Sequence, residues 1–350
     1  MNAARPDTRP DAPHRPDWVV ERLLALCAQD STSGHEDRML PALRDLLTRL
    51  GAELNEQEVA PGRTNVLAKW GEPKVLFSTH LDTVPPYLPP RLEGGAVHGR
   101  GSCDAKGQIL AQLAAIHGLV AEGHGGLAWL GVVGEETDSA GAAAALQLAP
   151  RLTKLKALIN GEPTEGRLAT GQRGVQRWRL RCQGVAAHSG SPELGKNAAW
   201  LLLDWLQRLR QEPLPEDPEL GAEIWNLGLL SAGEAPNVIP AHAEADLLAR
   251  VLPGSSFGER IRALAPPEGS VELLLSEPAD RYPELPGHPR AAMPFGSDAP
   301  QLRRLVPGGM VVLAGPGTIT VAHTDREHLT LADLDAGIAL NRALALHFLE

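Results

Sequence analysis

Cysteine is scarce in this chain. Only Cys27, Cys103 and Cys182 occur among 350 residues, and none of them belongs to a CxxC pair. So sparse and odd a set predicts neither a disulfide framework nor a zinc site built from thiolates. It indicates a reducing compartment, and we expect the protein to be cytoplasmic.

A surplus of positive charge is also missing. The chain carries 33 Lys and Arg residues against 43 Asp and Glu residues, which gives a formal net charge of -10 at pH 7. Phosphate backbones and anionic membranes attract clustered basic residues, so this balance argues against nucleic acid and membranes as partners. No apolar run reaches the roughly 18 residues of a membrane-spanning helix. Residues 1–16 mix Arg, Pro and Asp, and we predict that they form a disordered tail.

The remaining composition allows a substantial core. At 350 residues, 43% of them hydrophobic, the chain favours two domains over one. Short apolar runs lie at 65–70, 75–78, 127–133 and 157–159, and a helical stretch at 107–120 separates the second run from the third. Strand, helix, strand order predicts an α/β fold with a mostly parallel sheet and helices on both faces.

Two helices are expected ahead of this sheet. Asp17 can cap the first, in which Val19, Leu23 and Leu26 share one side. A second, leucine-rich stretch runs over 40–50 and is expected to end there, because a glycine follows it. The beginning of the ordered chain is therefore predicted to be helical.

A different pattern begins near Gly174. Apolar Trp178, Leu180 and Cys182 alternate with three arginines over 176–182. Such alternation is typical of a strand with one solvated face, as found in antiparallel sheets. We therefore predict a separate antiparallel sheet in this part of the chain.

The rest of this second region is predicted to be α/β as well. A helix over 196–210 is expected to turn Trp200, Leu203, Leu206 and Leu209 inward. Strand-like runs follow at 224–230 and 243–251, and the chain later returns to a strand at 310–314 and a closing helix after Thr330. We predict that residues 173–283 form a smaller domain. It would be inserted into a larger domain made of residues 17–172 and 284–350.

Imidazole and carboxylate groups follow the predicted strands. His80 comes after the strand at 75–78, Glu135 and Glu136 after 127–133, Glu162 after 157–159, and His323 beyond 310–314. In an open α/β sheet, ligands bind at the carboxyl ends of the strands, so residues far apart in sequence can converge there. An imidazole and several carboxylates suit two divalent cations that share one water and attack an amide.

Local geometry supports this hypothesis. Neighbouring side chains in a strand point to opposite faces, so Glu135 and Glu136 are expected just past the strand end, where Gly134 permits a turn. Asp82 lies two positions after His80 and could accept its second N–H. Nitrogen and oxygen donors without a thiolate suit zinc, with cobalt or manganese as alternatives.

Several short motifs give the chain a family resemblance. They are HLDTVP at 80–85, GRGSCDAKG at 99–107, GEE at 134–136, GEP at 161–163, and GPG at 315–317 with AHT at 322–324. In this order they resemble the dinuclear metal aminoacylase and carboxypeptidase family that includes acetylornithine deacetylase and succinyl-diaminopimelate desuccinylase. The resemblance runs from about His80 to the carboxyl terminus. Each tripeptide alone is a weak signal, whereas the ordered combination is a strong one.

The resemblance implies a role for each of these residues. Two divalent metal ions would be the cofactors: His80 and Glu162 would hold one, Glu136 and His323 the other, and Asp104 would bridge them. Three ligand carboxylates and a bridging hydroxide would cancel the four positive charges.

The same resemblance makes Glu135 the general base. It would take a proton from the shared water and deliver it to the leaving nitrogen. Cys103 is adjacent to Asp104, yet a buried, inert thiol is the expected state.

The resemblance extends into the inserted domain. It implies that residues 173–283 are a lid and dimerisation domain and that residues 17–172 and 284–350 are the catalytic domain. His188 would reach from the neighbouring subunit of a homodimer to stabilise the oxyanion of the tetrahedral intermediate; a histidine that caps a strand turn is the structural alternative. Asn237 and Arg250 would bind the substrate carboxylate, for which a planar guanidinium is well shaped. A surface ion pair is the alternative for Arg250. Gly296 and Ser297 resemble a nearby substrate loop, although relatives often carry Thr where Gly296 stands.

These expectations combine into one function. We predict a metal-dependent amidohydrolase that removes an N-acyl group from a small-molecule amino acid, with acetylornithine as the leading substrate. Three alternatives stay open: a hydrolase that releases lysine or ornithine from a small amino-group carrier protein, a metallo-dipeptidase or carboxypeptidase, and a catalytically silent binding homologue.

Overall fold

The computed structural model describes residues 15–350, which divide into two compact units. The first unit comprises the chain up to Ala169 together with Tyr282–Ala291 and Ser297–Glu350, and the second comprises Thr170–Arg281 and Ala292–Gly296. The predicted tail, residues 1–16, lies outside the described residues except for its last two. None of the described helices combines the length and apolar character needed to cross a bilayer. The cytoplasmic location stays a prediction.

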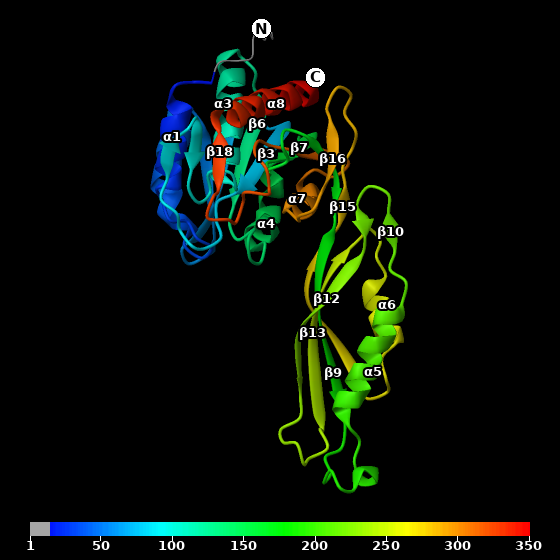
Figure 1. Ribbon diagram of the computed structural model, residues 1–350. Helices are drawn as coiled ribbons and strands as arrows, with labels where there is room; N and C mark the ends of the chain where they lie inside the picture. Colours follow the sequence, from blue (N-terminus) through cyan, green and yellow to red (C-terminus); the bar gives the residue numbers. More distant parts are fainter. Residues whose placement is uncertain (1–14) are drawn as a thin grey trace, which may run out of the picture. The chain divides into compact units, whose positions relative to one another are not determined.

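A six-stranded sheet forms the centre of the first unit (Figure 1). Its strands, in spatial order, are β1 (Glu53–Ala60), β2 (Arg63–Trp70), β6 (Leu127–Val132), β3 (Val75–His80), β7 (Ala157–Asn160) and β17 (Met310–Leu313). The last four of these run parallel to one another, while β2 runs antiparallel to both of its neighbours. Every residue of β3, β6 and β7 is buried, as expected for a parallel sheet covered on both sides. The predicted mostly parallel α/β fold is confirmed.

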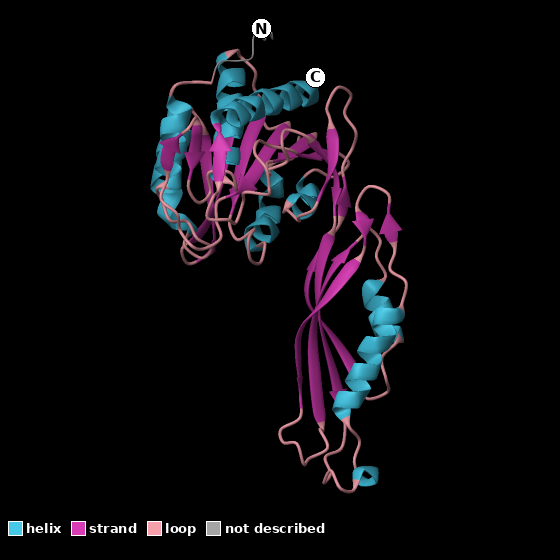
Figure 2. Cartoon of the chain, viewed as in Figure 1, coloured by secondary structure: helices cyan, strands magenta, loops and turns pink. Residues whose placement is uncertain are grey.

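Helices cover this sheet (Figure 2). Helix α3 packs against α1, α8, β3 and β6, and twelve of its residues are buried, so its sequence shows little amphipathic pattern. Helix α4 packs against β1, β2 and β6, and α7 packs against β17. The helices are α1 (Trp18–Cys27), α2 (Leu40–Arg49), α3 (Lys106–Ala121), α4 (Ala140–Ala145), α7 (Ala299–Leu302) and α8 (Leu331–Leu349).

The prediction that Asp17 caps α1 is wrong. Its side chain accepts no hydrogen bond from the helix, and its backbone already has helical angles, with φ -55° and ψ -32°. A capping residue needs non-helical angles to turn its side chain toward the first amides. The first turn closes further back, because the Val19 N–H donates to the carbonyl of Pro16.

The second unit contains an antiparallel sheet of four strands. In spatial order they are β12 (Ile224–Ala232), β13 (His242–Val251), β9 (Gly174–Gln183) and β14 (Gly269–Glu277). Helix α5 (Ala198–Gln211) lies along β9 and β13 (Figure 1), and α6 (Phe257–Ala263) packs on β14. Trp178, Leu180 and Cys182 are buried on the helix-covered face, as predicted from their alternation with arginines. The opposite face of this sheet is called the open face below.

The predicted inward face of α5 is wrong in part. Trp200 is 64% exposed and Leu203 is 40% exposed, whereas Leu206 and Leu209 are buried. The buried side is set by Leu202 and Trp205 with Leu206 and Leu209, which recur at intervals of three and four. The helix also begins at Ala198, because the side chain of Asn197 caps it.

Short elements complete the fold. Two three-stranded sheets have the orders β18 (His328–Thr330), β5 (Ala96–His98), β4 (Arg91–Glu93) and β15 (Asp280–Arg281), β8 (Leu168–Gln172), β16 (Arg290–Met293). A two-stranded sheet joins β10 (Glu216–Asp217) and β11 (Gly221–Ala222). The 3-10 helices are η1 (Glu36–Met39), η2 (Leu146–Arg151), η3 (Pro192–Leu194) and η4 (Arg303–Leu305).

Candidate metal centre

The four parallel strands end at one edge of the sheet, and the predicted ligands lie there. Strand β3 runs to His80 itself, two residues further than its apolar run predicts. Glu135 and Glu136 follow β6 after Gly134, whose φ of +79° makes the predicted turn. Glu162 lies two residues beyond β7. His323 also contributes to this place, so residues 243 positions apart in the sequence, His80 and His323, lie in one cluster.

Two sets of metal-binding atoms share Asp104. Atoms of His80, Asp104 and Glu162 lie within 4.8 Å of one another, and so do those of Asp104, Glu136 and His323. The Nε2 atom of His80 is 2.9 Å from Oδ1 of Asp104, and Nε2 of His323 is 3.4 Å from Oδ2. His323 also lies 2.9 Å from Glu136. The two carboxylate oxygens of Asp104 thus face two different groups, which is the arrangement that a bridging ligand requires.

Glu135 adjoins both sets. Its carboxylate, with atoms of His80 and Glu136, forms a third group within 4.8 Å. Both glutamates can face this place because they stand beyond the last residue of β6, where strand alternation no longer applies. The geometry thus brings together all the ligands and the base that the motifs predict.

The charge of this cluster suits divalent cations. Burial, with the charge of Glu162 nearby, raises the pKa of Glu135 well above its usual range, and burial does the same to the pKa of Glu162. Hydrogen bonds to Asp104 and Glu136 raise the pKa of His323 to about 10. These shifts report a surplus of buried negative charge, which two dications would balance. The donor set of imidazole nitrogens and carboxylate oxygens fits zinc, cobalt or manganese.

Asp82 supports the site mainly through the backbone. The Nδ1 atom of His80 is 2.9 Å from the carbonyl oxygen of Asp82, and 3.5 Å from its carboxylate, which was the predicted partner. The carboxylate is engaged elsewhere: it accepts three backbone N–H groups of residues 134–136 at 3.1 Å each and the Ser33 hydroxyl at 2.8 Å. Asp82 therefore orients the ring of His80 and fixes the turn that carries both glutamates.

Arg63 forms ion pairs with two acidic residues next to Gly134. Arg63 donates to Glu36 at 3.1 Å and to the two oxygens of Asp138 at 3.2 and 3.3 Å. A Cβ at Gly134 would collide with Arg63 and Asp138. Glycine is therefore required here for space as well as for its positive φ, and only the second reason was predictable from the sequence.

Glu327 is a buried carboxylate that the sequence analysis missed. One of its oxygens accepts the backbone N–H groups of Gly101, Cys103 and Asp104 at 2.9, 3.2 and 3.1 Å. The other accepts a hydrogen bond from the Arg100 guanidinium. Glu327 therefore holds the loop that presents Asp104. Cys103 is itself buried, burial raises the pKa of its thiol well above the usual range, and the predicted inert thiol agrees with this.

Arg100 connects the same loop to the one that bears His323. Its guanidinium donates to the carbonyl oxygen of Thr324 at 3.2 Å and to that of Pro86 at 3.2 Å. His323 has φ +62°, a left-handed conformation that residues with a side chain rarely adopt. The buried pair of Arg100 and Glu327 therefore holds two backbone segments by hydrogen bonds: the loop that carries Asp104 and the loop that carries His323. Two features of the sequence could have suggested this pair: an arginine inside the second motif and a glutamate four residues after His323.

His188 and Asn237 lie next to each other in the second unit. His188 forms a β-bridge with Val238, and the Ser189 N–H donates to the carbonyl oxygen of Asn237 at 3.0 Å. The Gly190 N–H donates to Nδ1 of His188 at 3.1 Å. Because Nδ1 accepts, the proton of the neutral ring resides on Nε2, which can then donate to an oxyanion.

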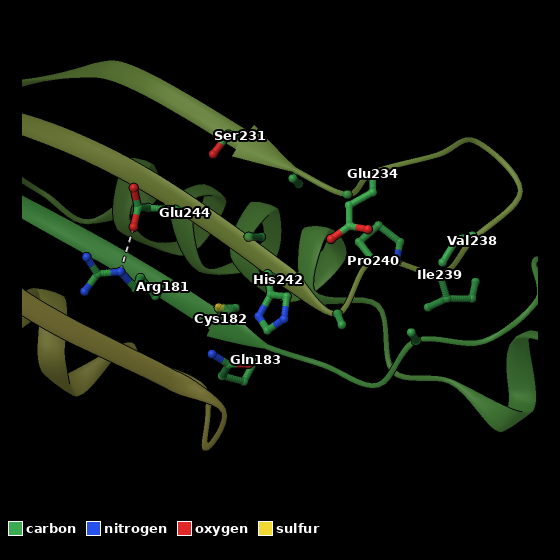
Figure 3. A pocket seen from close by; sticks show the side chains of 15 residues that line it. Arg181, Cys182, Gln183, Ser231, Glu234, Val238, Ile239, Pro240, His242 and Glu244 are labelled. Atoms are coloured by element: carbon green, nitrogen blue, oxygen red, sulfur yellow. Dashed lines mark hydrogen bonds and ion pairs between the residues drawn. The ribbon is translucent and has the colours of Figure 1, made fainter.

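A cavity of about 470 Å³ lies beside this segment (Figure 3). Its wall includes Val238 and Ile239, which directly follow Asn237, and an ion pair of Arg181 with Glu244 at 2.6 Å. None of the predicted metal ligands lines it. The cavity therefore belongs to the end of the sheet that carries His188 and not to the metal centre.

Arg250 lies at the opposite end of the same sheet. It stands opposite Val175 in the register, whereas His242, at the start of β13, stands opposite Gln183. The difference of 250 - 242 = 8 positions corresponds to about 26 Å along the strand. Within one chain, this unit therefore keeps Arg250 far from His188.

Gly296 and Ser297 fall on either side of the division between the units. A Cβ at Gly296 would lie 3.8 Å from Oε2 of Glu277 in the second unit. In the first unit, the Ser297 hydroxyl oxygen accepts the N–H of Ala299 at 3.3 Å. The substrate-binding roles of Gly296 and Ser297 stay predictions, as do those of Asn237 and Arg250.

Comparison with known sequences gives one family. A profile described as peptidase family M20/M25/M40 matches residues 76–347. A Peptidase M20 domain-containing protein of Schizosaccharomyces pombe is 34% identical over 343 residues, which cover 92% of this chain and 82% of that protein. A probable carboxypeptidase of Aspergillus clavatus is 32% identical over 367 residues, which cover 93% and 81% of the two chains.

Solved structures agree on the fold. Aminopeptidase PepT of Bacillus cereus has a TM-score of 0.79 at 20% identity and covers 95% of this chain and 98% of its own. The YXEP protein of Bacillus subtilis, described as a dinuclear metal binding peptidase, has a TM-score of 0.70 at 15% identity, with 94% and 98% of the chains covered. At such identities the likeness concerns the fold alone.

Proposed function

Since the chain belongs to peptidase family M20/M25/M40 and is a hydrolase of amide bonds, we propose that it removes an N-acyl group from an amino acid, with two divalent metal ions as cofactors. Acetylornithine is the leading substrate. The position of Asp104 is the observation that supports this most, because its two oxygens face two separate sets of nitrogen and oxygen ligands.

The chain's own residues would divide the work of amide hydrolysis. His80 and Glu162 would hold one ion, Glu136 and His323 the second, and Asp104 both. When bound, two such ions supply an activated water and polarise the amide oxygen. Glu135 would accept the proton of the attacking water and pass it to the leaving nitrogen. Its carboxylate lies within 4.8 Å of metal-binding atoms of His80 and Glu136, which would put it beside both ions.

A metallo-dipeptidase or carboxypeptidase is the second candidate. The relative from Aspergillus clavatus is described as a probable carboxypeptidase, and such an enzyme would use the same residues around the amide. The difference would lie in what the protein accepts on the acyl side. A hydrolase that frees lysine or ornithine from a carrier protein also shares this chemistry.

One experiment separates these candidates. The purified protein is analysed for metal content and then assayed on N-acetyl amino acids, dipeptides, and peptides with a free carboxyl terminus. About two metal ions per chain and turnover of N-acetyl amino acids above dipeptides are expected. Preference for dipeptides would favour the second candidate. Absence of metal uptake and of hydrolysis would favour the catalytically silent homologue. Metal analysis also decides among zinc, cobalt and manganese.

The proposal includes a homodimer formed through the second unit. Strand β12 is at the edge of its sheet, and Ile224, Leu229 and Leu230 on it are 50%, 62% and 49% exposed. Exposed Trp200 on α5 adds to this apolar surface. An apolar edge strand offers free backbone groups to a second strand, and a second copy of β12 can pair with it about a two-fold axis.

A dimer would also allow His188 to act in the site of the other subunit. Arg250 and His188 lie at opposite ends of one sheet, in which β13 separates Arg250 from His242 by about 26 Å and His188 bridges Val238 beyond His242. A single chain could therefore not readily apply both to a small substrate. We propose that each site takes His188, with Asn237 beside it, from the partner subunit. His188→Ala is then expected to lower kcat by about a hundredfold or more, with little change in KM.

Subunit mixing tests this arrangement. His188→Ala and Glu135→Ala proteins are each expected to be nearly inactive. Random mixing of the two is expected to restore roughly a quarter of wild-type activity, because half of the dimers then hold one intact site. Size-exclusion chromatography with light scattering confirms the dimers in the mixture. Dimers without recovered activity would place His188 in its own subunit's site, and a monomeric wild type would remove the dimer from the proposal.

A further inference from the structure

The open face of the second unit carries rows of charged residues. Cross-strand partners share a face, so the register defines which side chains stand side by side. In one row Arg179 donates to Asp246 at 2.7 Å, and in the next Arg181 donates to Glu244 at 2.6 Å. Arg181 also donates to Glu272 on β14 at 2.8 Å. In these rows each arginine is bonded to an acid on a neighbouring strand.

The last row differs from these. Arg250 of β13 and Glu277 of β14 are both opposite Val175 of β9, so the two charged residues flank one buried valine on the open face. Within residues 15–350 neither side chain forms a hydrogen bond or an ion pair. Their charges nevertheless influence each other, because Arg250 opposes the upward shift that burial gives to the pKa of Glu277.

A β-bulge creates this row. The register of β14 on β9 shifts by one residue between Leu273 and Leu275, and this shift places Glu277 opposite Val175. With an uninterrupted register, Ser276 would stand there and Glu277 would point to the helix-covered face.

Gly296 lies beside the carboxylate of Glu277. A Cβ added at this position would lie 3.8 Å from Oε2 of Glu277 and 4.0 Å from the side chain of Gln172. A Cβ in this position would already be in van der Waals contact with the carboxylate, so a longer side chain would compete with a ligand for the space beside it. Gly296 was expected to belong to a substrate loop, and its small size leaves room for a ligand group beside Glu277.

We infer that Glu277 and Arg250 form a subsite for the leaving amino acid, in which Arg250 binds its carboxylate and Glu277 binds a positively charged side chain. This rests on the proposed function, in which Arg250 reads the substrate carboxylate. A guanidinium binds a carboxylate in two parallel hydrogen bonds. A half-buried carboxylate without a partner is satisfied by an ammonium group.

The chemistry identifies the substrate class. The α-nitrogen of an N-acyl amino acid is part of the amide that is cleaved, so it carries no charge. The ammonium group that Glu277 binds must therefore be on the side chain, as in ornithine or lysine. Glu277 is thus the residue that selects basic amino acids among N-acylated ones.

Matched substrates test this inference. N-acetylornithine and N-acetylnorvaline differ only in the terminal ammonium, and so do N-acetyllysine and N-acetylnorleucine. For the metal-loaded wild type, kcat/KM is expected to favour the basic member of each pair by about tenfold to a hundredfold. Glu277→Gln is expected to remove this preference by lowering kcat/KM for the basic substrates alone.

Glu272→Gln is the control, because Glu272 is an acid of the same strand and face that already has an arginine partner. It should retain the wild-type ratio. Equal turnover of both members by the wild type, or an equal loss on both in Glu277→Gln, would overturn the inference and leave Glu277 with a structural role.

Binding of the free amino acids separates this inference from the proposed function. Titration calorimetry of the wild type with ornithine and with norvaline requires no turnover. Tighter binding of ornithine that is lost in Glu277→Gln supports the subsite even if no N-acyl amino acid is hydrolysed, in which case the proposed function alone fails. Equal or absent binding of both amino acids would overturn the subsite.

Discussion

The two units arrange their acidic side chains in opposite ways. In the first unit, Glu135 and Glu162 gather with Asp104 in a buried cluster, and burial and mutual repulsion raise the pKa of both glutamates. On the open face of the second unit, Asp246 lies between two arginines, which lower the pKa of its carboxyl to about 2 against the opposing effect of desolvation. Paired charges stabilise the fold by themselves. A buried cluster of like charges is unfavourable unless protons or a cation balance it, and such clusters concentrate at functional sites.

The largest expected effect concerns the cluster. Glu135→Gln should lower turnover by about a hundredfold to ten-thousandfold, because an amide cannot accept the proton of the attacking water. The content of bound metal should not change, since Glu135 is not one of the five expected ligands. Activity assays with metal analysis measure both. Glu21→Gln, an exposed acid of α1, is the control. Turnover within tenfold of the wild type would remove Glu135 from the role of base.

The next effect concerns the buried pair behind the cluster. Glu327→Gln should weaken metal binding by about tenfold to a hundredfold and lower Tm, because the amide leaves Arg100 without its counter-charge and the loop of Asp104 less fixed. Metal titration and thermal unfolding measure the two effects.

The surface pair of Glu122 with Arg342 provides the control for Glu327. Glu122→Gln should change neither metal binding nor Tm by much, because solvent and salt screen an exposed ion pair, which then contributes little to stability. If Glu327→Gln lowered Tm but kept full metal affinity, its role would be limited to stability.

The smallest effect concerns the open face. The carboxyl of Asp246 has its pKa lowered from 3.8 to about 2 in the folded chain, so its stabilising effect is complete above about pH 4 and is lost as the pH falls toward 2. Asp246→Asn should lower stability at pH 7 and reduce the change in stability across that interval. Denaturant unfolding at several pH values, followed by tryptophan fluorescence, measures this. Asp204→Asn on α5 should behave as the wild type; if Asp246→Asn did too, the rows would not contribute to stability.

The sequence predicted the features that depend on local order. The apolar runs that became β3, β6 and β7 are short and fully buried, and the ligands follow them directly, so their convergence could be predicted from the topology of parallel sheets. The alternation in β9 was equally clear. The motifs also named the residues whose metal-binding atoms the structure brings together, because each motif is contiguous.

Features that depend on packing between distant segments were not predictable. The exposure of Trp200 depends on which face of α5 meets the sheet, and four other apolar residues of the helix determine that. The contacts of Asp82 depend on the turn after β6, and the role of Glu327 depends on a loop that is 223 positions away from it at Asp104. None of these partners is adjacent in the sequence, so periodicity contains no information about them.

The bulge in β14 has a consequence for comparing this chain with its relatives. A relative that lacks the extra residue near Leu274 can carry glutamate at the aligned position and still direct it into the packing beneath α5 and α6, where it could not meet a ligand. Conversely, deletion of one residue from this strand would remove the charge from the open face without altering Glu277 itself. Substrate preference among such proteins would then follow the length of one strand, and an alignment scored by residue identity alone would overlook it.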